Sequence, residues 1–138
     1  MAKDVFHNAV KQALVQDGWT ITHDPLTLSV GGVDMAIDLG AEQLIGAARE
    51  NQLIAVEVKS FLAQSSAISE FHTALGQFLN YRSALHQREP ERILWLAIPI
   101  NAQISFFRRE FPQLMIREHQ IKLLIYDPEA EVIVEWKN

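Results

Sequence analysis

The 138-residue chain contains no cysteine, and its apolar residues never form a run long enough to span a membrane. The missing thiols exclude a disulfide framework, a thiolate zinc site and a cysteine nucleophile. A membrane-spanning helix needs about 18 consecutive apolar residues, and the opening stretch MAKDVFH is too polar for the core of a secretory signal. We therefore expect a cytoplasmic protein that does not enter a membrane.

Basic residues are also in short supply, with 12 Lys and Arg against 17 Asp and Glu, a net charge of −5. This balance disfavours a protein that binds nucleic acid through a surface that is basic all over, although it permits a local basic groove. No repeat, linker or low-complexity stretch interrupts the chain. The apolar content of 49% is that of an ordinary globular protein. We expect residues 1–138 to form a single domain.

Helical spacing and strict alternation of apolar residues follow one another along the chain, which predicts an α/β domain. The strands before and after the long helix imply a mixed sheet with helices packed against it. The expected helices cover residues 4–17, 41–50, 65–87 and 102–110, and the expected strands cover 19–23, 33–39, 53–59, 93–100, 121–126 and 132–136.

Two charged residues stand in the most apolar of these strands, as Glu57-Val58-Lys59. Strand side chains alternate, so Glu57 and Lys59 share a face. Charges in such a strand are costly unless they meet partners, water or metal. The simplest explanation is an ordinary salt bridge at a strand end.

Asp38 favours a second explanation, because it can approach Glu57 if the strand before it pairs with the Glu57 strand. Two close carboxylates repel unless a cation lies between them, and hard oxygen ligands suit Mg²⁺ or Mn²⁺. Lys59 could then orient a water nucleophile or stabilise the charge of a phosphorane-like transition state. An Asp followed by Glu-x-Lys on a neighbouring strand therefore indicates phosphodiester hydrolysis.

The long helix carries polar residues along the flank of its apolar arc, at Glu70, Gln77 and Tyr81. This flank meets the sheet, so we expect Gln77 and Tyr81 to point toward Lys59 or Glu57. The alternative is an ordinary helix flank, with Gln77 bonded to a backbone group.

Asp38, Glu57-Val58-Lys59 and the segment from Gln77 to Tyr81 resemble the D…(D/E)xK…QxxxY signature of the PD-(D/E)XK nuclease superfamily. A closer resemblance covers nearly the whole chain. It joins this sequence to the XisH family, the fdxN element excision controlling factors of cyanobacteria. The segments that carry it are residues 17–25, 37–42, 54–61 and 69–81.

The superfamily resemblance implies a restriction-endonuclease-like αβββαβ core, here with extra C-terminal strands. It implies Mg²⁺ or Mn²⁺ held by Asp38, Glu57 and the Val58 carbonyl, with Lys59 as the catalytic lysine and Gln77 and Tyr81 as the helix motif. The family resemblance implies control of the excision of a DNA element, with DNA and a XisI-like protein as partners. The alternative is a catalytically inactive module that binds DNA or that partner, since a fold does not establish an activity.

Some positions stay open in the sequence. Ile37 stands where the superfamily motif has proline. Asp4, His7 and Glu42 could each join the site, although Glu42 is better explained as a cap of the short helix expected over residues 41–50. For DNA phosphates the candidate contacts are Lys59, Arg82 and Arg108, and the sequence leaves open whether the protein is a homodimer.

Overall fold

The computed structural model describes residues 2–45, 50–62 and 66–138. Helices and strands alternate along the chain, as the sequence patterns predict for a mixed α/β fold. In chain order the elements are α1 (Ala2–Gln16), β1 (Thr20–His23), β2 (Leu26–Val30), β3 (Val33–Ile37), β4 (Leu39–Ile45), β5 (Glu50–Val58), α2 (Ala67–Arg88), β6 (Ile93–Pro99), α3 (Ile100–Ser105), α4 (Glu110–His119), β7 (Leu123–Asp127) and β8 (Val132–Lys137).

Six strands form the main sheet, in the order β1-β4-β5-β6-β7-β8. Strand β5 pairs antiparallel with β4 and parallel with β6, while β6 and β7 are also parallel. The parallel step from β5 to β6 needs a crossover, which α2 supplies. This confirms the expected mixed sheet with helices on it, and it places the Glu57 strand in the middle of the sheet.

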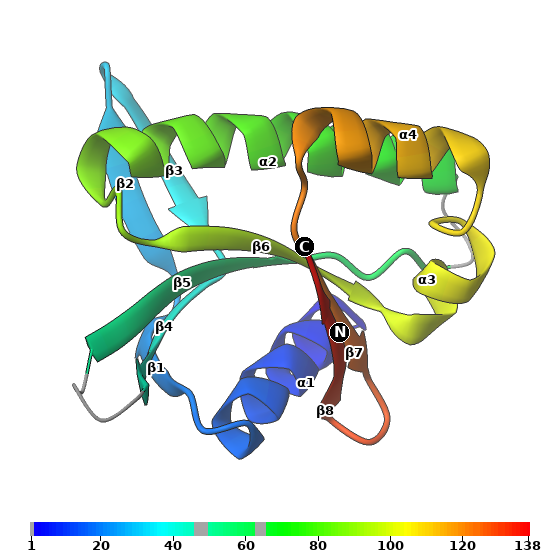
Figure 1. Ribbon diagram of the computed structural model, residues 1–138, viewed down its shortest axis with the longest axis horizontal. Coiled ribbons are helices and arrows are strands. Elements are labelled where there is room, and N and C mark those ends of the chain that lie inside the picture. Colours follow the sequence, from blue (N-terminus) through cyan, green and yellow to red (C-terminus); the bar gives the residue numbers. More distant parts are fainter. Residues whose placement is uncertain (1, 46–49, 63–65) are drawn as a thin grey trace.

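The sheet separates two apolar cores, because alternate residues of each strand point to opposite faces. On one face α1 packs through residues such as Val10 and Leu14. On the other face α2 packs through Phe71 and Phe78, and α4 lies beside it (Figure 1). Ala55 of β5 belongs to the α2 side, so alternation places Glu57 on that side as well.

A hairpin of β2 and β3 forms a second, two-stranded sheet beside α2 (Figure 1). Its turn is Gly31-Gly32, where φ values of +58° and +81° favour glycine over residues with a side chain. Leu26 and Ile37 turn inward against the α2-side core. The predicted strand 33–39 is therefore two strands that meet at Asp38, and β2 was not predicted.

The prediction of a helix over residues 41–50 is wrong for its described part, because residues 41–45 belong to β4. Residues 46–49 of that prediction lie outside the described residues. Local composition favoured a helix, whereas pairing with β5 on one side and β1 on the other stabilises a strand. The interpretation of Glu42 as a helix cap fails for the same reason.

The segment after β6 holds two helices instead of the single one predicted over 102–110. Pro99 ends β6, as predicted, where its missing N–H is not needed. Helix α3 ends at Ser105, and α4 begins at Glu110 and runs to His119.

Among the helices of the described residues, none combines the length and apolarity that crossing a membrane requires.

Candidate active site

Asp38 and Glu57 lie at the same level of two neighbouring chain segments. Asp38 occupies the single position between β3 and β4. The first residue of β4, Leu39, pairs with Val56 in antiparallel register. Asp38 precedes Leu39 and Glu57 follows Val56, so the register sets the two carboxylates opposite each other at the end of β5. The predicted approach of Asp38 to Glu57 thus has its origin in strand pairing.

Two hydrogen bonds hold the carboxylates in place. The backbone N–H of Val58 donates to Asp38 Oδ2 at 2.8 Å. The backbone N–H of Asp38 donates to Glu57 Oε1 at 3.2 Å. Each acidic side chain is therefore fixed by the backbone of the other strand, which is the kind of support that holds a binding group in one position.

Lys59 follows directly after β5 and lies beside Glu57. Its Nζ is 3.6 Å from Glu57 Oε2, and the two side chains are 18% and 8% exposed. The backbone of Lys59 is fixed on both sides, because its N–H donates to the Ala97 carbonyl at 2.9 Å and its carbonyl accepts from the Tyr126 hydroxyl at 3.0 Å. The structure thus brings Asp38, Glu57 and Lys59 together.

The electrostatics of this group are unusual. Burial, reinforced by the negative charge of Asp38, raises the pKa of Glu57 from 4.5 to about 7, and Lys59 only partly opposes the shift. Shifted pKa values are common at functional sites, where buried ionisable groups bind ligands or exchange protons. The Glu57 carboxyl therefore keeps its proton to a higher pH than an exposed glutamate does.

A cavity of about 250 Å³ opens beside Glu57, onto Asp38 and Lys59. Asp38, Val58 and Lys59 line it from the sheet, Glu70 lines it from α2, and His7 lines it from α1. The His7 ring is held by Asp24, with Nε2 2.7 Å from Oδ1. His7 therefore reaches the cavity but already has an acidic partner of its own.

Sequence reasoning missed two residues of this site, Glu70 and Tyr126. Glu70 Oε2 is buried, and no partner for it exists among the described residues. Burial raises the pKa of Glu70, with Lys59 acting against the shift. The helix flank that contains Glu70 was recognised in the sequence, but its depth in the cavity depends on packing. Nothing in the sequence around Tyr126 indicates that its hydroxyl donates a hydrogen bond to the Lys59 carbonyl.

Gln77 and Tyr81 lie farther along α2, where they line a separate cavity of about 600 Å³ beside the β2–β3 hairpin. Burial raises the pKa of Tyr81, and the negative charges of Glu57 and Asp38 add to the effect. Tyr81 is therefore within electrostatic reach of the carboxylates. Gln77 Oε1 is buried without a partner in the described part of the chain. No hydrogen bond within that part joins either side chain to Glu57 or Lys59.

Three other candidates, Glu42, Arg82 and Arg108, lie away from the carboxylate pair. Glu42 is four residues along the sheet from Asp38, which corresponds to about 13 Å. Arg82 donates to the carbonyls of His119 and Gln120 at 2.7 and 3.1 Å. Arg108 is exposed on the segment between α3 and α4. The Asp4 side chain falls outside the described residues.

The donor chemistry of the site fits a hard divalent cation. Asp38, Glu57 and Glu70 bring three carboxyl groups near a single lysine, so ionised carboxylates leave the site with uncompensated negative charge. Val58 lines the same cavity. Within residues 2–45, 50–62 and 66–138, however, no group of three or more acidic or histidine side chains is placed to hold a metal ion. A cation would therefore rest on Asp38 and Glu57, completed by a carbonyl and water.

The comparison with known families agrees with the resemblance seen in the sequence. The family described as "XisH protein" matches residues 1–134. The chain belongs to the XisH family.

Two solved structures are similar to this XisH chain over almost their entire length. An XisH family protein from Nostoc punctiforme PCC 73102 is 59% identical, with a TM-score of 0.90, and the match covers 98% of this chain and 100% of that one. An fdxN element excision controlling factor protein from Anabaena variabilis is 58% identical, also with a TM-score of 0.90, over 98% of this chain and 99% of that one. No protein of curated function matches this XisH chain.

Proposed function

We propose that this protein is a metal-dependent DNA phosphodiesterase of the PD-(D/E)XK type that acts in the excision of a DNA element. The observation that carries the proposal is the convergence of Asp38, Glu57 and Lys59 at the end of β5. The role in excision is supported by the similar Anabaena variabilis protein, whose description is that of an fdxN element excision controlling factor.

Each residue has a chemical role in this proposal. Asp38 and Glu57, with the Val58 carbonyl, would hold Mg²⁺ or Mn²⁺, which supplies Lewis-acid polarisation of a phosphate and a more acidic bound water. Lys59 presents its ammonium beside Glu57, where it stabilises negative charge that develops on the phosphoryl oxygens. Gln77 and Tyr81 are proposed to position substrate or Lys59 from α2.

A cleavage assay with and without metal tests this proposal. Supercoiled plasmid incubated with the purified protein should be nicked or linearised in Mg²⁺ or Mn²⁺ and left intact in EDTA. DNA binding should weaken steeply as salt rises, because each phosphate contact releases counterions. Equal cleavage with and without metal would contradict the proposal.

A specific surface favours a second candidate function, a non-catalytic module that acts through a XisI-like protein partner. Ile104, Phe111 and Leu114 are 53%, 52% and 45% exposed on α3 and α4. Phe111 and Leu114 line a surface cavity of about 630 Å³ together with Arg108. Exposed apolar side chains with an arginine at the rim are typical of protein interfaces. Absence of both cleavage and DNA affinity at low salt with metal present would favour this second function.

A further inference from the structure

The cavity of about 600 Å³ between the β2–β3 hairpin and the second half of α2, here called the hairpin cavity, has two unlike walls. Figure 1 shows the hairpin and the helix beside each other. Val30 and Val33 pair across the hairpin and form one wall together with Met35. The other wall belongs to α2 and carries polar side chains, namely Gln77, Asn80, Tyr81, Ser83 and Gln87. The volume lies in the range of about 300–1,000 Å³ typical of small-molecule sites.

The hairpin cavity is uncharged. Among the described side chains that line it, none is acidic, basic or a histidine. Its hairpin wall is apolar and stays open to solvent, since Val33 is 56% exposed, whereas its helix wall offers amides and hydroxyls. A phosphate or a metal ion would meet no opposite charge here. The lining instead fits an uncharged, flat group with apolar faces and a polar edge.

The polar side chains of the helix wall have no structural hydrogen bonds. On this stretch of α2, Arg82 and Arg88 donate to backbone carbonyls of other elements. Within residues 2–45, 50–62 and 66–138, none of the five polar side chains of the hairpin cavity forms a hydrogen bond. Asn80 and Gln87 are exposed, and each amide can both donate and accept. Their hydrogen-bonding groups are therefore available to a ligand.

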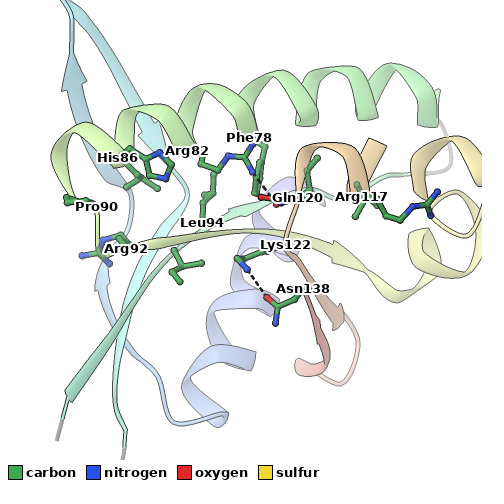
Figure 2. A pocket seen from close by; sticks show the side chains of 14 residues that line it. Phe78, Arg82, His86, Pro90, Arg92, Leu94, Arg117, Gln120, Lys122 and Asn138 are labelled. Carbon is green, nitrogen blue, oxygen red and sulfur yellow. Dashed lines mark hydrogen bonds between the residues drawn. The ribbon is translucent and has the colours of Figure 1, made fainter. Parts of the chain in front are cut away.

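A larger groove of about 810 Å³, on the other flank of α2, differs in this respect (Figure 2). Figure 2 shows Arg82 reaching from α2 toward Gln120, and its Nη1 donates to that carbonyl at 3.1 Å. Arg92 in the same groove donates to the Ile54 carbonyl at 2.8 Å. These two guanidinium groups connect elements of the fold, which the polar groups of the hairpin cavity do not.

The hairpin cavity adjoins the candidate active site. Met35 precedes Asp38 by three residues, which corresponds to about 10 Å along an extended chain. On the helix side, burial raises the pKa of Tyr81, and the charges of Glu57 and Asp38 add to the effect. Tyr81 thus lines the hairpin cavity and lies within electrostatic reach of the carboxylates. A nucleic-acid strand with one phosphate at Asp38 and Glu57 could place a neighbouring base in the hairpin cavity.

We propose that the hairpin cavity binds an unpaired base of the DNA strand whose phosphate lies at Asp38 and Glu57. The inference rests on the proposed function and names its substrate class, DNA with a single-stranded or unstacked base. A base within a duplex is stacked, so a pocket can take it up only once it has left the stack. Val33 and Met35 would contact the face of the base. Asn80 and Gln87 would bond its edge, as amides do with adenine.

Two DNA duplexes that differ in one group test this inference. Both contain an unpaired nucleotide at the same position, which is adenine in one and a tetrahydrofuran abasic residue in the other, so their phosphates are the same. Fluorescence anisotropy at low salt in EDTA measures binding without cleavage. The native protein should bind the adenine duplex about tenfold more tightly than the abasic one, a typical contribution of contacts to one base. Equal affinity for the two duplexes, or no binding of either, would overturn the inference.

A pair of asparagine variants localises the effect. Asn80→Ala should weaken binding of the adenine duplex about fivefold, the usual effect of one lost hydrogen bond, and leave binding of the abasic duplex unchanged. Asn8→Ala removes the same amide from an exposed position of α1 outside the hairpin cavity and should leave both affinities unchanged. Equal losses in the two variants would overturn the inference.

Plasmid cleavage separates the failure of this inference from the failure of the proposed function. Metal-dependent cleavage by a protein that does not prefer the adenine duplex would support the phosphodiesterase and overturn the role of the hairpin cavity. A preference that depends on Asn80, in a protein that cleaves nothing in Mg²⁺ or Mn²⁺, would support the base site and contradict the phosphodiesterase.

Discussion

Lys59→Ala is expected to lower metal-dependent DNA cleavage by a factor on the order of 10²–10³, the usual cost of losing one electrostatic stabiliser of a transition state. Lys59 is the cation beside the carboxylate pair, with Nζ 3.6 Å from Glu57 Oε2. Lys59→Arg should restore little activity, because the planar guanidinium differs from ammonium in shape and donor geometry.

The same substitution is expected to leave the protein folded. Breaking a buried ion pair can cost about 3–5 kcal/mol when the remaining charge is trapped. Glu57, however, has a pKa already raised to about 7, so it can take up a proton when Lys59 is removed. The Lys59 backbone also keeps its bonds to Ala97 and Tyr126.

Thermal melts and cleavage assays on one preparation separate these effects. Lys11→Ala is a matched control, because Lys11 also pairs with an acidic residue, at 2.8 Å from Asp24, but does not line the cavity that contains Asp38 and Lys59. It should retain full cleavage. A large fall in melting temperature for Lys59→Ala, with cleavage preserved, would show that Lys59 is structural.

Titration of the Glu57 carboxyl should lower the free energy of unfolding by roughly 3 kcal/mol as pH rises from below 4.5 to above 7. Burial and the charge of Asp38 raise the pKa of Glu57 from 4.5 to about 7 in the folded state. Between these values the native protein holds more protons than the unfolded chain, so unfolding becomes easier with each increase in pH. The stabilisation is complete below the unfolded pKa and is lost above the folded one.

Urea unfolding of the native protein and of Glu57→Gln, measured across this pH range without metal, isolates that contribution. The glutamine has no charge to bury, so the variant should gain stability relative to the native protein as pH rises. Glu91→Gln, at an exposed position, controls for the loss of one carboxyl group. A stability difference between native protein and Glu57→Gln that does not change with pH would show that Glu57 has an ordinary pKa.

Strand alternation predicted the shared face of Glu57 and Lys59, and the approach of Asp38 was predicted on the condition that its strand pairs with the Glu57 strand. A period of two places Glu57 and Lys59 on one face, and antiparallel pairing sets Asp38 opposite Glu57. The contributions of Glu70 and Tyr126 could not be predicted in this way. Each reaches Lys59 or its cavity from a distant element, so their positions depend on how α2 and β7 pack.

The errors in the predicted fold have a common physical origin. Residues 41–45 contain good helix formers, yet hydrogen bonds to two neighbouring strands outweigh that local preference. Strand β2 is only five residues long and follows Pro25 directly, so its local signal is weak. It exists because β3 pairs with it and because Leu26 and Leu28 pack into the α2-side core.

Binding of Mn²⁺, followed by the loss of the free-ion signal in electron paramagnetic resonance, tests the central claim that Asp38 and Glu57 form a metal site. The native protein should bind one ion per chain, and Asp38→Asn should bind it at least about tenfold more weakly. Asp34→Asn removes an exposed carboxylate of β3 and should bind as the native protein does. Equal Mn²⁺ affinity in Asp38→Asn, Asp34→Asn and the native protein would contradict the account.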